Sequence, residues 1–188
     1  MRIISGNHKG KKILLPKDKL TRPLKDLTKE SIFNIIKHSK LLNVEIEKSN
    51  ILDLFSGIGS FGLECLSRGA AYVTFFENYK EVLIILKKNI DNLKQQNYSN
   101  IIEKDIFLKN TLEGLNRKFD IIFMDPPFKE KKLTCLLNII IKLKLLKDNG
   151  IIIIHRHKKE KDIFPNEFNI IIKKSYGISK IIFGDTLG

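Results

Sequence analysis

Cysteine and tryptophan are scarce in this chain, which has two cysteines and no tryptophan among 188 residues. Cys65 and Cys135 are far apart, each in an apolar stretch, so the sequence predicts neither a disulfide framework nor a CxxC metal site. We expect both to be buried free thiols. His155 and His157 also suggest a metal site, but no third ligand is in view, so we expect no metal.

Long apolar runs are missing as well. No stretch approaches the roughly 20 apolar residues that cross a bilayer. The first residues soon turn basic and lack the apolar core that a secretory signal needs. We therefore expect a cytoplasmic protein with no membrane partner. The length suits one main domain, and we expect a monomer.

Acidic residues are too few to balance the basic ones, and the net charge is +13. Residues 1–40 hold eleven Lys or Arg against three acidic residues, a net charge of +8. Such a segment suits a polyanion, although lysines can also do no more than keep a surface solvated. The candidate RNA-binding side chains are Arg2, Lys9, Lys11, Lys12 and Arg22.

The same region differs in pattern from the rest of the chain. Short runs at residues 2–5 and 11–15 flank a glycine-punctuated stretch, which predicts a small N-terminal β-hairpin. We expect residues 1–22 to form a basic arm and residues 23–188 to form the main domain. Helical spacing of apolar residues predicts a helix over residues 24–40.

From residue 51 onward, strand-like and helix-like patterns alternate, which indicates an α/β fold with a mostly parallel, doubly wound sheet. The last two strands predict a C-terminal antiparallel hairpin. The expected strands are residues 51–55, 72–76, 99–103, 119–124, 150–154, 168–176 and 178–183. One expected helix follows the glycines and ends at about residue 68. Two others span residues 79–95 and 133–146, and a variable helix lies between residues 103 and 119.

Polar motifs follow four of these strands. Residues 53–59 end the first strand, Glu77 ends the second, Asp105 follows the third and residues 125–128 follow the fourth. Ligands of doubly wound sheets bind beyond the carboxyl ends of the strands. We therefore expect one site at this edge of the sheet.

A glycine loop at residues 57–62 matches GxGxxG, and Glu77 lies 20 residues beyond Gly57. This pattern fits NAD and S-adenosylmethionine alike, because both contain an adenosine ribose that a carboxylate can bind. Asp53 favours S-adenosylmethionine, since a carboxylate there would repel a diphosphate and attract an ammonium or sulfonium. Candidate cofactor-binding residues are Asp53, Phe55, Ser56, Gly57, Gly59, Phe61, Glu77, Asn78, Asp105 and Ile106.

Two of these candidates have other possible uses. Asp105 could accept a hydrogen bond from the adenine amine, with Ile106 against the ring, or it could cap a helix. Glu77 could bind ribose hydroxyls, or it could be a solvated charge at a strand end.

Asp125, Pro126, Pro127 and Phe128 are the candidate catalytic residues. Two consecutive prolines stiffen the loop and remove two N–H donors. The Asp125 carboxylate and the Pro126 carbonyl could accept both hydrogens of an exocyclic amine, which directs its lone pair at a methyl group. Phe128 could stack on the target base. The alternative is a simple proline turn.

The chain resembles the RsmD family of bacterial methyltransferases. The resemblance covers residues 2–6 and 9–12, Arg22 and Pro23, residues 30–34, 53–59, 62–64 and 66–70, Glu77 and residues 125–128. It implies a Rossmann-like class I methyltransferase fold and methylation of a guanine N2 amine in 16S ribosomal RNA. It also implies S-adenosylmethionine as cofactor, S-adenosylhomocysteine as product, and small-subunit RNA or an assembling 30S particle as partner.

The resemblance further implies that Arg22 and the helix after it help to close the cofactor site. Leu24 and Lys25 stand where the family has threonines, and residues 155–157 stand where it has an acidic residue. Three other activities stay open from the residues alone. These are a DNA or other RNA amine methyltransferase, a dehydrogenase and an RNA-binding module without catalysis.

Overall fold

The computed structural model describes residues 1–16, 24–108 and 110–187. Arg22, a candidate RNA-binding residue, lies outside these ranges. No helix within them is long and apolar enough to cross a membrane. The described strands are β1 (Asn50–Leu54), β2 (Tyr72–Phe76), β3 (Ser99–Ile102), β4 (Phe119–Met124), β5 (Leu146–His157), β6 (Phe168–Tyr176) and β7 (Ser179–Thr186).

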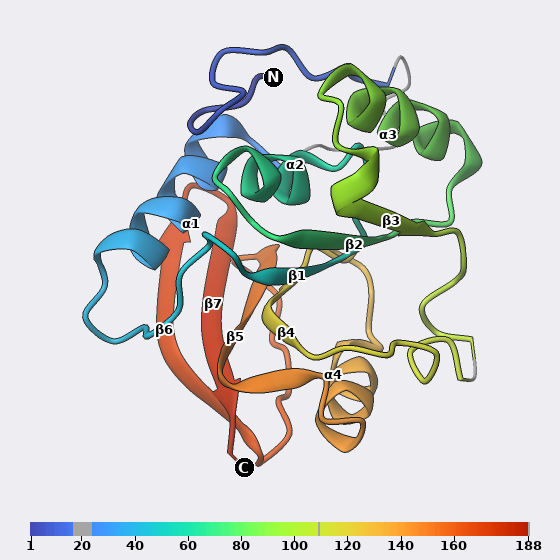
Figure 1. Cartoon of the computed structure of the whole chain (residues 1–188). Helices are drawn as coiled ribbons and strands as arrows, with labels where there is room; N and C mark the ends of the chain where they lie inside the picture. Colours follow the sequence, from blue (N-terminus) through green and yellow to red (C-terminus); the bar gives the residue numbers. More distant parts are fainter. Residues whose placement is uncertain (17–23, 109, 188) are drawn as a thin grey trace.

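These strands form one twisted sheet at the centre of the molecule, in the order β3-β2-β1-β4-β5-β7-β6 (Figure 1). The pairs from β3 to β5 are parallel, whereas β7 pairs antiparallel with both β5 and β6. A mostly parallel sheet with a C-terminal antiparallel hairpin is therefore confirmed. The first four strands and β6 match their predicted ranges to within one residue, whereas β5 starts four residues early and ends three late, and β7 ends three residues late.

Helices cover both faces of the sheet. They are α1 (Asp26–His38), α2 (Ser60–Ser67), α3 (Lys80–Asn92) and α4 (Leu133–Lys142), with a short 3-10 helix at Gln96–Tyr98. Alternate residues of the strands enter two separate cores, because successive side chains of a strand point to opposite faces. Ile51 and Phe123 pack with α1, α2 and α3, whereas Leu52 and Ile122 pack with α4. The sheet is thus doubly wound.

The variable helix expected between residues 103 and 119 is wrong for the described residues, which form turns there. The Asp105 carboxylate accepts a hydrogen bond from the Phe107 amide, and the Thr111 hydroxyl donates to the Asp105 carbonyl. Such local bonds between side chains and backbone compete with a helix. Cys135 is also exposed rather than buried, because α4 turns Leu133, Leu136 and Leu137 toward the sheet.

The N-terminal hairpin is reduced to one antiparallel bridge between Arg2 and Lys12. The amides of Ile4 and Ser5 donate to the carboxylate of Glu64, in α2, at 2.8 and 2.9 Å instead of pairing across a ladder. Gly6 is required at the next position because a Cβ there would lie 1.8 Å from the Ser67 carbonyl oxygen. This segment is therefore packed tightly against α2.

Candidate active site

One cavity of about 240 Å³ lies at the carboxyl ends of the parallel strands. The sheet order places β1 between β2 and β4, so the loops after these three strands lie next to one another. The cavity brings together several predicted cofactor residues and one residue of the predicted target loop. Its lining consists of Phe55, Phe76, Glu77, Asn78, Lys104, Asp105, Ile106, Phe107, Pro127 and Glu130.

A second cavity, of about 300 Å³, lies at the opposite edge of the sheet, where β1 and β4 begin. Asp120 in its wall already accepts hydrogen bonds from the Asn50 amide and the Lys147 ammonium. None of the sequence motifs reaches this edge. The smaller cavity is therefore the better candidate for an active site.

The loop after β1 has a tightly specified backbone. Phe55 (φ 62°), Gly57 (φ 55°) and Gly59 (φ 83°) all adopt the left-handed region, where a residue other than glycine costs about 1–3 kcal/mol. The Phe55 ring lines the cavity and lies 5.9 Å from the Phe107 ring. The Ser56 hydroxyl donates to the Asp53 carbonyl at 2.6 Å, so Ser56 braces the loop. The strain thus occurs where the cavity wall is built.

Asp53 is a buried carboxylate whose hydrogen bonding is incomplete. Its Oδ2 accepts from the Gly62 amide at 3.0 Å, whereas its Oδ1 has no partner among the described residues. Burial raises the pKa of Asp53 well above its ordinary value, and the nearby carboxylates of Asp125 and Glu77 raise it further. The Ser60 hydroxyl, at the start of α2, is also buried without a described partner.

These two orphaned atoms test whether the site fits S-adenosylmethionine. Buried polar atoms are rarely left unpaired, and a ligand can supply the missing partner. The methionine end of S-adenosylmethionine carries an ammonium for the Asp53 carboxylate. It also carries a carboxylate for the Ser60 hydroxyl and the amino end of α2. The residues present therefore fit this cofactor.

Glu77 holds the cofactor loop and the start of α3 together. Its Oε2 accepts from the Gly57 amide at 2.8 Å, and its Oε1 accepts from the amides of Asn78 and Tyr79 at 2.9 Å. A carboxylate has about four acceptor positions, so one remains for a ribose hydroxyl. Glu77 is thus more than a solvated charge at the end of a strand.

The remaining cofactor candidates divide into two groups. Asp105 and Ile106 line the cavity, and Asp105 caps a turn there rather than a helix. Phe61 instead stacks between Phe33 and Phe123, with ring centroids 5.2 and 4.1 Å away, and is 2% exposed. Its ring belongs to the core, so only its backbone is free to approach a cofactor.

The predicted target loop continues directly from β4. The Asp125 carboxylate lies 2.7 Å from His155 Nδ1, and His155 Nε2 lies 2.8 Å from the Ser179 hydroxyl. The Phe128 ring meets the rings of His155 and His157 edge-on, at centroid distances of 5.9 and 5.2 Å. The side chains of residues 155–157 therefore contact both polar and aromatic parts of the loop.

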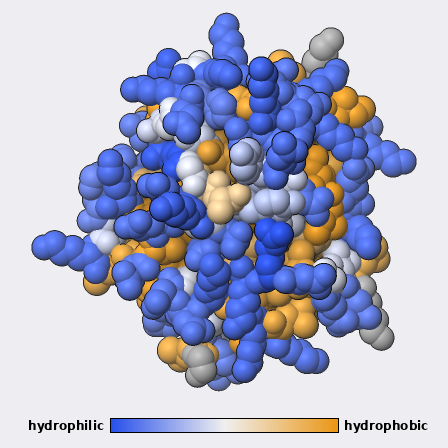
Figure 2. Space-filling view, in the orientation of Figure 1, coloured by the Kyte–Doolittle hydropathy of each residue, from blue (hydrophilic) through white to orange (hydrophobic). Residues whose placement is uncertain are grey.

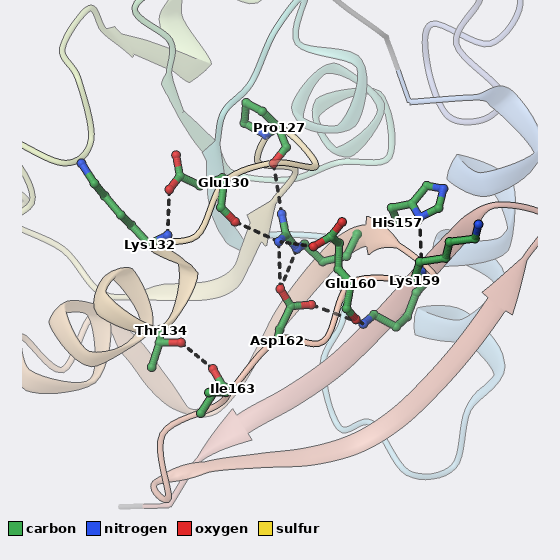
Figure 3. Close-up of polar contacts among 11 residues, drawn as sticks. Pro127, Glu130, Lys132, Thr134, His157, Lys159, Glu160, Asp162 and Ile163 are labelled. Atoms are coloured by element: carbon green, nitrogen blue, oxygen red, sulfur yellow. Dashed lines mark hydrogen bonds and ion pairs between the residues drawn. The ribbon is translucent and has the colours of Figure 1, made fainter.

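Arg156 is 2% exposed and fixes the backbone of the same loop. Its guanidinium donates to the carbonyls of Pro127 and Glu130 at 3.1 and 2.9 Å and pairs with Asp162 at 2.9 Å. Figure 3 labels Pro127, Glu130 and Asp162 and marks these contacts with dashed lines. The Pro127 carbonyl also accepts from the Glu130 amide at 2.8 Å, so both of its acceptor positions are used within the loop.

Sequence reasoning did not assign roles to Ser60, His155, Arg156 or Ser179. A signal existed for two of them, since His155 and Arg156 directly follow four isoleucines and polar residues rarely extend a buried strand without a partner. No group of three or more suitable metal ligands occurs in the described part of the chain.

Arg2, Lys9, Lys11 and Lys12 are exposed on the N-terminal segment. In Figure 2 mostly hydrophilic side chains cover the upper part of the molecule, where this segment lies in Figure 1. Its position is fixed by Glu64, which is fully buried and also pairs with Lys29 and Arg68. Burial lowers the pKa of Lys29, and Glu64 opposes that shift.

Comparisons with known proteins agree with this architecture. The family model described as "Conserved hypothetical protein 95" matches residues 1–185. Ribosomal RNA small subunit methyltransferase D of Buchnera aphidicola subsp. Acyrthosiphon pisum is 36% identical over 176 residues, which cover 92% of this chain and 86% of that protein.

Two solved structures superpose over nearly the whole chain. The yhhF protein of Escherichia coli, named as a methyltransferase, is 26% identical with a TM-score of 0.81 and covers 99% of this chain and 97% of its own. The methylase HI0767 of Haemophilus influenzae is 31% identical with a TM-score of 0.78 and covers 100% and 98%. The chain therefore belongs to the RsmD family and has the fold of class I methyltransferases that use S-adenosylmethionine.

Proposed function

We propose that the protein transfers a methyl group from S-adenosylmethionine to the N2 amine of a guanine in 16S ribosomal RNA. One observation carries the proposal: a single cavity is lined both by the loops fitted to the cofactor and by Pro127 of the target loop. Methyl donor and acceptor would share this space. The family's small-subunit relatives support ribosomal RNA as the substrate class.

Different residues at the site would bind different parts of the cofactor. Asp53 Oδ1 accepts from the ammonium, and Glu77 accepts from the ribose. Asp105 accepts from the adenine amine, and Ile106 and Phe55 cover the ring. Asn78, Gly57 and Gly59 contribute close backbone approach. When bound, S-adenosylmethionine supplies a methyl group on a positively charged sulfur.

The target loop would orient the acceptor. Asp125 and the Pro126 carbonyl each accept one hydrogen of the amine, so its lone pair faces the methyl group. Phe128 stacks on the guanine, which must first leave its helix. Stacking of this kind contributes about 1–3 kcal/mol per base. Positioning therefore supplies most of the catalysis, and no metal takes part.

Residues 1–22 would act as the RNA-gripping arm of a methyltransferase domain formed by residues 23–188. Arg2, Lys9, Lys11, Lys12 and Arg22 would contact phosphates. The substrate is small-subunit RNA, alone or within an assembling 30S particle. Bacterial ribosomes assemble in the cytoplasm, which is the compartment that this activity requires, and the site as built needs only one copy of the chain.

A methylation assay tests the reaction. The protein is incubated with methyl-labelled cofactor and, separately, with small-subunit particles, free RNA and DNA, and the labelled nucleoside is identified. We expect N2-methylguanosine in RNA, lost in Asp125→Ala and retained in Asp148→Ala, an exposed aspartate at the opposite sheet edge. Label found only in DNA adenine or cytosine, or in another RNA nucleoside, refutes the proposal.

The arm is tested by RNA affinity at several salt concentrations. Changing Lys9, Lys11 and Lys12 together to Ala should weaken binding and lower the salt dependence by roughly one unit of slope for each lost phosphate contact. The matched control changes three other exposed lysines near the opposite sheet edge, Lys118, Lys142 and Lys144. Equal losses in both triple variants would show that the arm has no special role.

A further inference from the structure

We propose that His155 is a positioning residue for the methyl transfer, because it holds the Asp125 carboxylate with one oxygen turned toward the target amine. The inference rests on the proposed function. It starts from a chain of three side chains, Asp125, His155 and Ser179, joined by contacts of 2.7 and 2.8 Å.

The sheet itself places these groups together. Met124 pairs with Ile154 in the parallel ladder of β4 and β5, so the next residues, Asp125 and His155, leave the ladder side by side. On the other flank of β5, the antiparallel strand β7 begins with Ser179 opposite His157. His155 is thus fixed between a strand that carries the target loop and a strand that anchors its far nitrogen.

The hydrogen-bonding capacities of the groups fix their roles. An ionised carboxylate only accepts, so the His155 Nδ1 at 2.7 Å must be the donor. In the neutral ring Nε2 then has a lone pair and accepts from the Ser179 hydroxyl. Among the described residues the Asp125 carboxylate has no other hydrogen bond, which leaves its Oδ2 for the substrate.

The three hydrogen-bonded side chains face the substrate with the opposite end from those of a serine hydrolase. In a hydrolase the serine faces the substrate and the aspartate is the buried end. Here Ser179 is 7% exposed, whereas the Asp125 side chain is 20% exposed and belongs to the target loop. The imidazole therefore supports the carboxylate, and Ser179 supports the imidazole.

The same imidazole also contacts the aromatic part of the loop. Its ring meets the Phe128 ring edge-on at 5.9 Å and 74°, while His155 itself is 7% exposed. One buried side chain thus fixes both the hydrogen-bond acceptor and the stacking surface that the target guanine would meet. Small errors in such positions are costly to catalysis.

Methyl transfer shows why this alignment matters. The bond between the guanine nitrogen and the methyl carbon forms as the carbon–sulfur bond breaks, and the broken bond's electron pair stays on sulfur. The nitrogen then gives one proton to Asp125 Oδ2. Oδ1 is held by His155 throughout, so the carboxylate cannot rotate away from the amine.

The test compares His155→Leu, which has no donor, with His155→Asn, whose amide N–H can replace the Nδ1 donor. We expect His155→Leu to lower kcat about 100-fold, with the KM for RNA and the affinity for S-adenosylhomocysteine within about threefold of wild type. His155→Asn should recover roughly tenfold of that loss. Thermal unfolding of each variant shows whether it is folded.

His157→Leu is the matched control, because His157 meets Phe128 edge-on but is not bonded to Asp125. Its kcat should exceed that of His155→Leu by about tenfold or more. A folded His155→Leu variant with kcat within about threefold of wild type would overturn the proposal. So would equal activity of the Leu and Asn variants at position 155.

An NMR measurement separates this inference from the proposed function. The wild-type His155 Nδ1 proton should give a strongly downfield resonance that disappears in Asp125→Ala, which has no acceptor at this position. If that resonance is present and RNA is not methylated, the contact exists and the assigned reaction is wrong. If the resonance is absent, the positioning role of His155 is wrong whatever the enzyme methylates.

Discussion

Replacing Asp53 with asparagine should raise the folding stability of the cofactor-free protein and lower its affinity for the cofactor. Asp53 is 1% exposed, and its Oδ1 has no partner among the described residues. Asparagine keeps a carbonyl for the Gly62 amide and removes the buried charge beside Asp125 and Glu77. The asparagine amide is as unpartnered as Oδ1 was, so the gain comes from removing the buried charge, and we expect the free energy of unfolding to rise by about 1 kcal/mol or more.

The same change should reduce the affinity for S-adenosylhomocysteine, which keeps the ammonium of the cofactor. A hydrogen bond to a charged group contributes about 1.5–3 kcal/mol, which corresponds to a loss of roughly 10- to 150-fold. The Asp53 carboxylate would therefore favour cofactor binding and lower the folding stability of the cofactor-free protein. Asp148→Asn, at an exposed site, should change neither quantity by more than about 0.5 kcal/mol.

The pH dependence has a definite sign. Burial raises the pKa of Asp53, so the folded protein without cofactor holds this proton more tightly than the unfolded chain does. The resulting stability is fully present below the ordinary value of 3.8 and is lost as the pH rises toward the folded pKa. The stability advantage of Asp53→Asn should therefore grow with pH across that interval. Cofactor affinity of the wild type should rise over the same interval, because binding releases the proton.

Urea unfolding and calorimetric titration with S-adenosylhomocysteine, each at several pH values, measure these effects. The reasoning predicts opposite signs for stability and affinity in one variant. A variant that is less stable than wild type, or that binds S-adenosylhomocysteine equally well, would refute it. Loss of both stability and affinity would show that Asp53 is mainly a structural residue.

Three further outcomes follow from the packing. Glu64→Gln removes the buried anion of the Lys29 ammonium, which keeps only the half-exposed Asp26 at 3.8 Å, and should cost about 3–5 kcal/mol of unfolding free energy, measured by urea denaturation. A cost below about 1 kcal/mol would contradict this. Gly62→Ala places a Cβ 2.3 Å from the Phe75 ring and should cost about 1–3 kcal/mol by the same assay, despite alanine's better helix propensity. Arg156→Lys replaces three guanidinium nitrogens with one ammonium, which cannot bond both loop carbonyls and Asp162. Amide hydrogen exchange of residues 128–132 should therefore be faster than in the wild type, while that of β1 stays unchanged. An equal change in both regions, or none in either, would refute the role of Arg156.

The fold could be predicted from the sequence because its signals are local. Residues 119–124 form an apolar run that becomes a strand with the predicted bounds, since a run buried on both faces admits few other structures. The stretch after Asp105 misled the prediction, because its side chain bonds the Phe107 amide and ends the helical pattern at once. Such competition depends on a rotamer that periodicity does not reveal.

The candidate site was predictable only where residues follow one another along the chain. The strand ends place Asp53, Glu77 and Asp125 together by topology alone. His155 and Ser179 reach the same site through the register of β5 and β7. A hydrophobic pattern indicates which face of the sheet each residue occupies, but it does not indicate which residues of the two strands lie opposite one another. Phe61 shows the converse, since it lies within the glycine motif but points into the core.

The position of β7 has a consequence for synthesis. β7 follows β6 in sequence yet lies between β5 and β6, and it carries the serine that supports His155. While the chain is being made, β5 has no native neighbour on that flank until residues 179–186 have left the ribosome. During translation the site therefore stays incomplete until β7 has emerged from the ribosome.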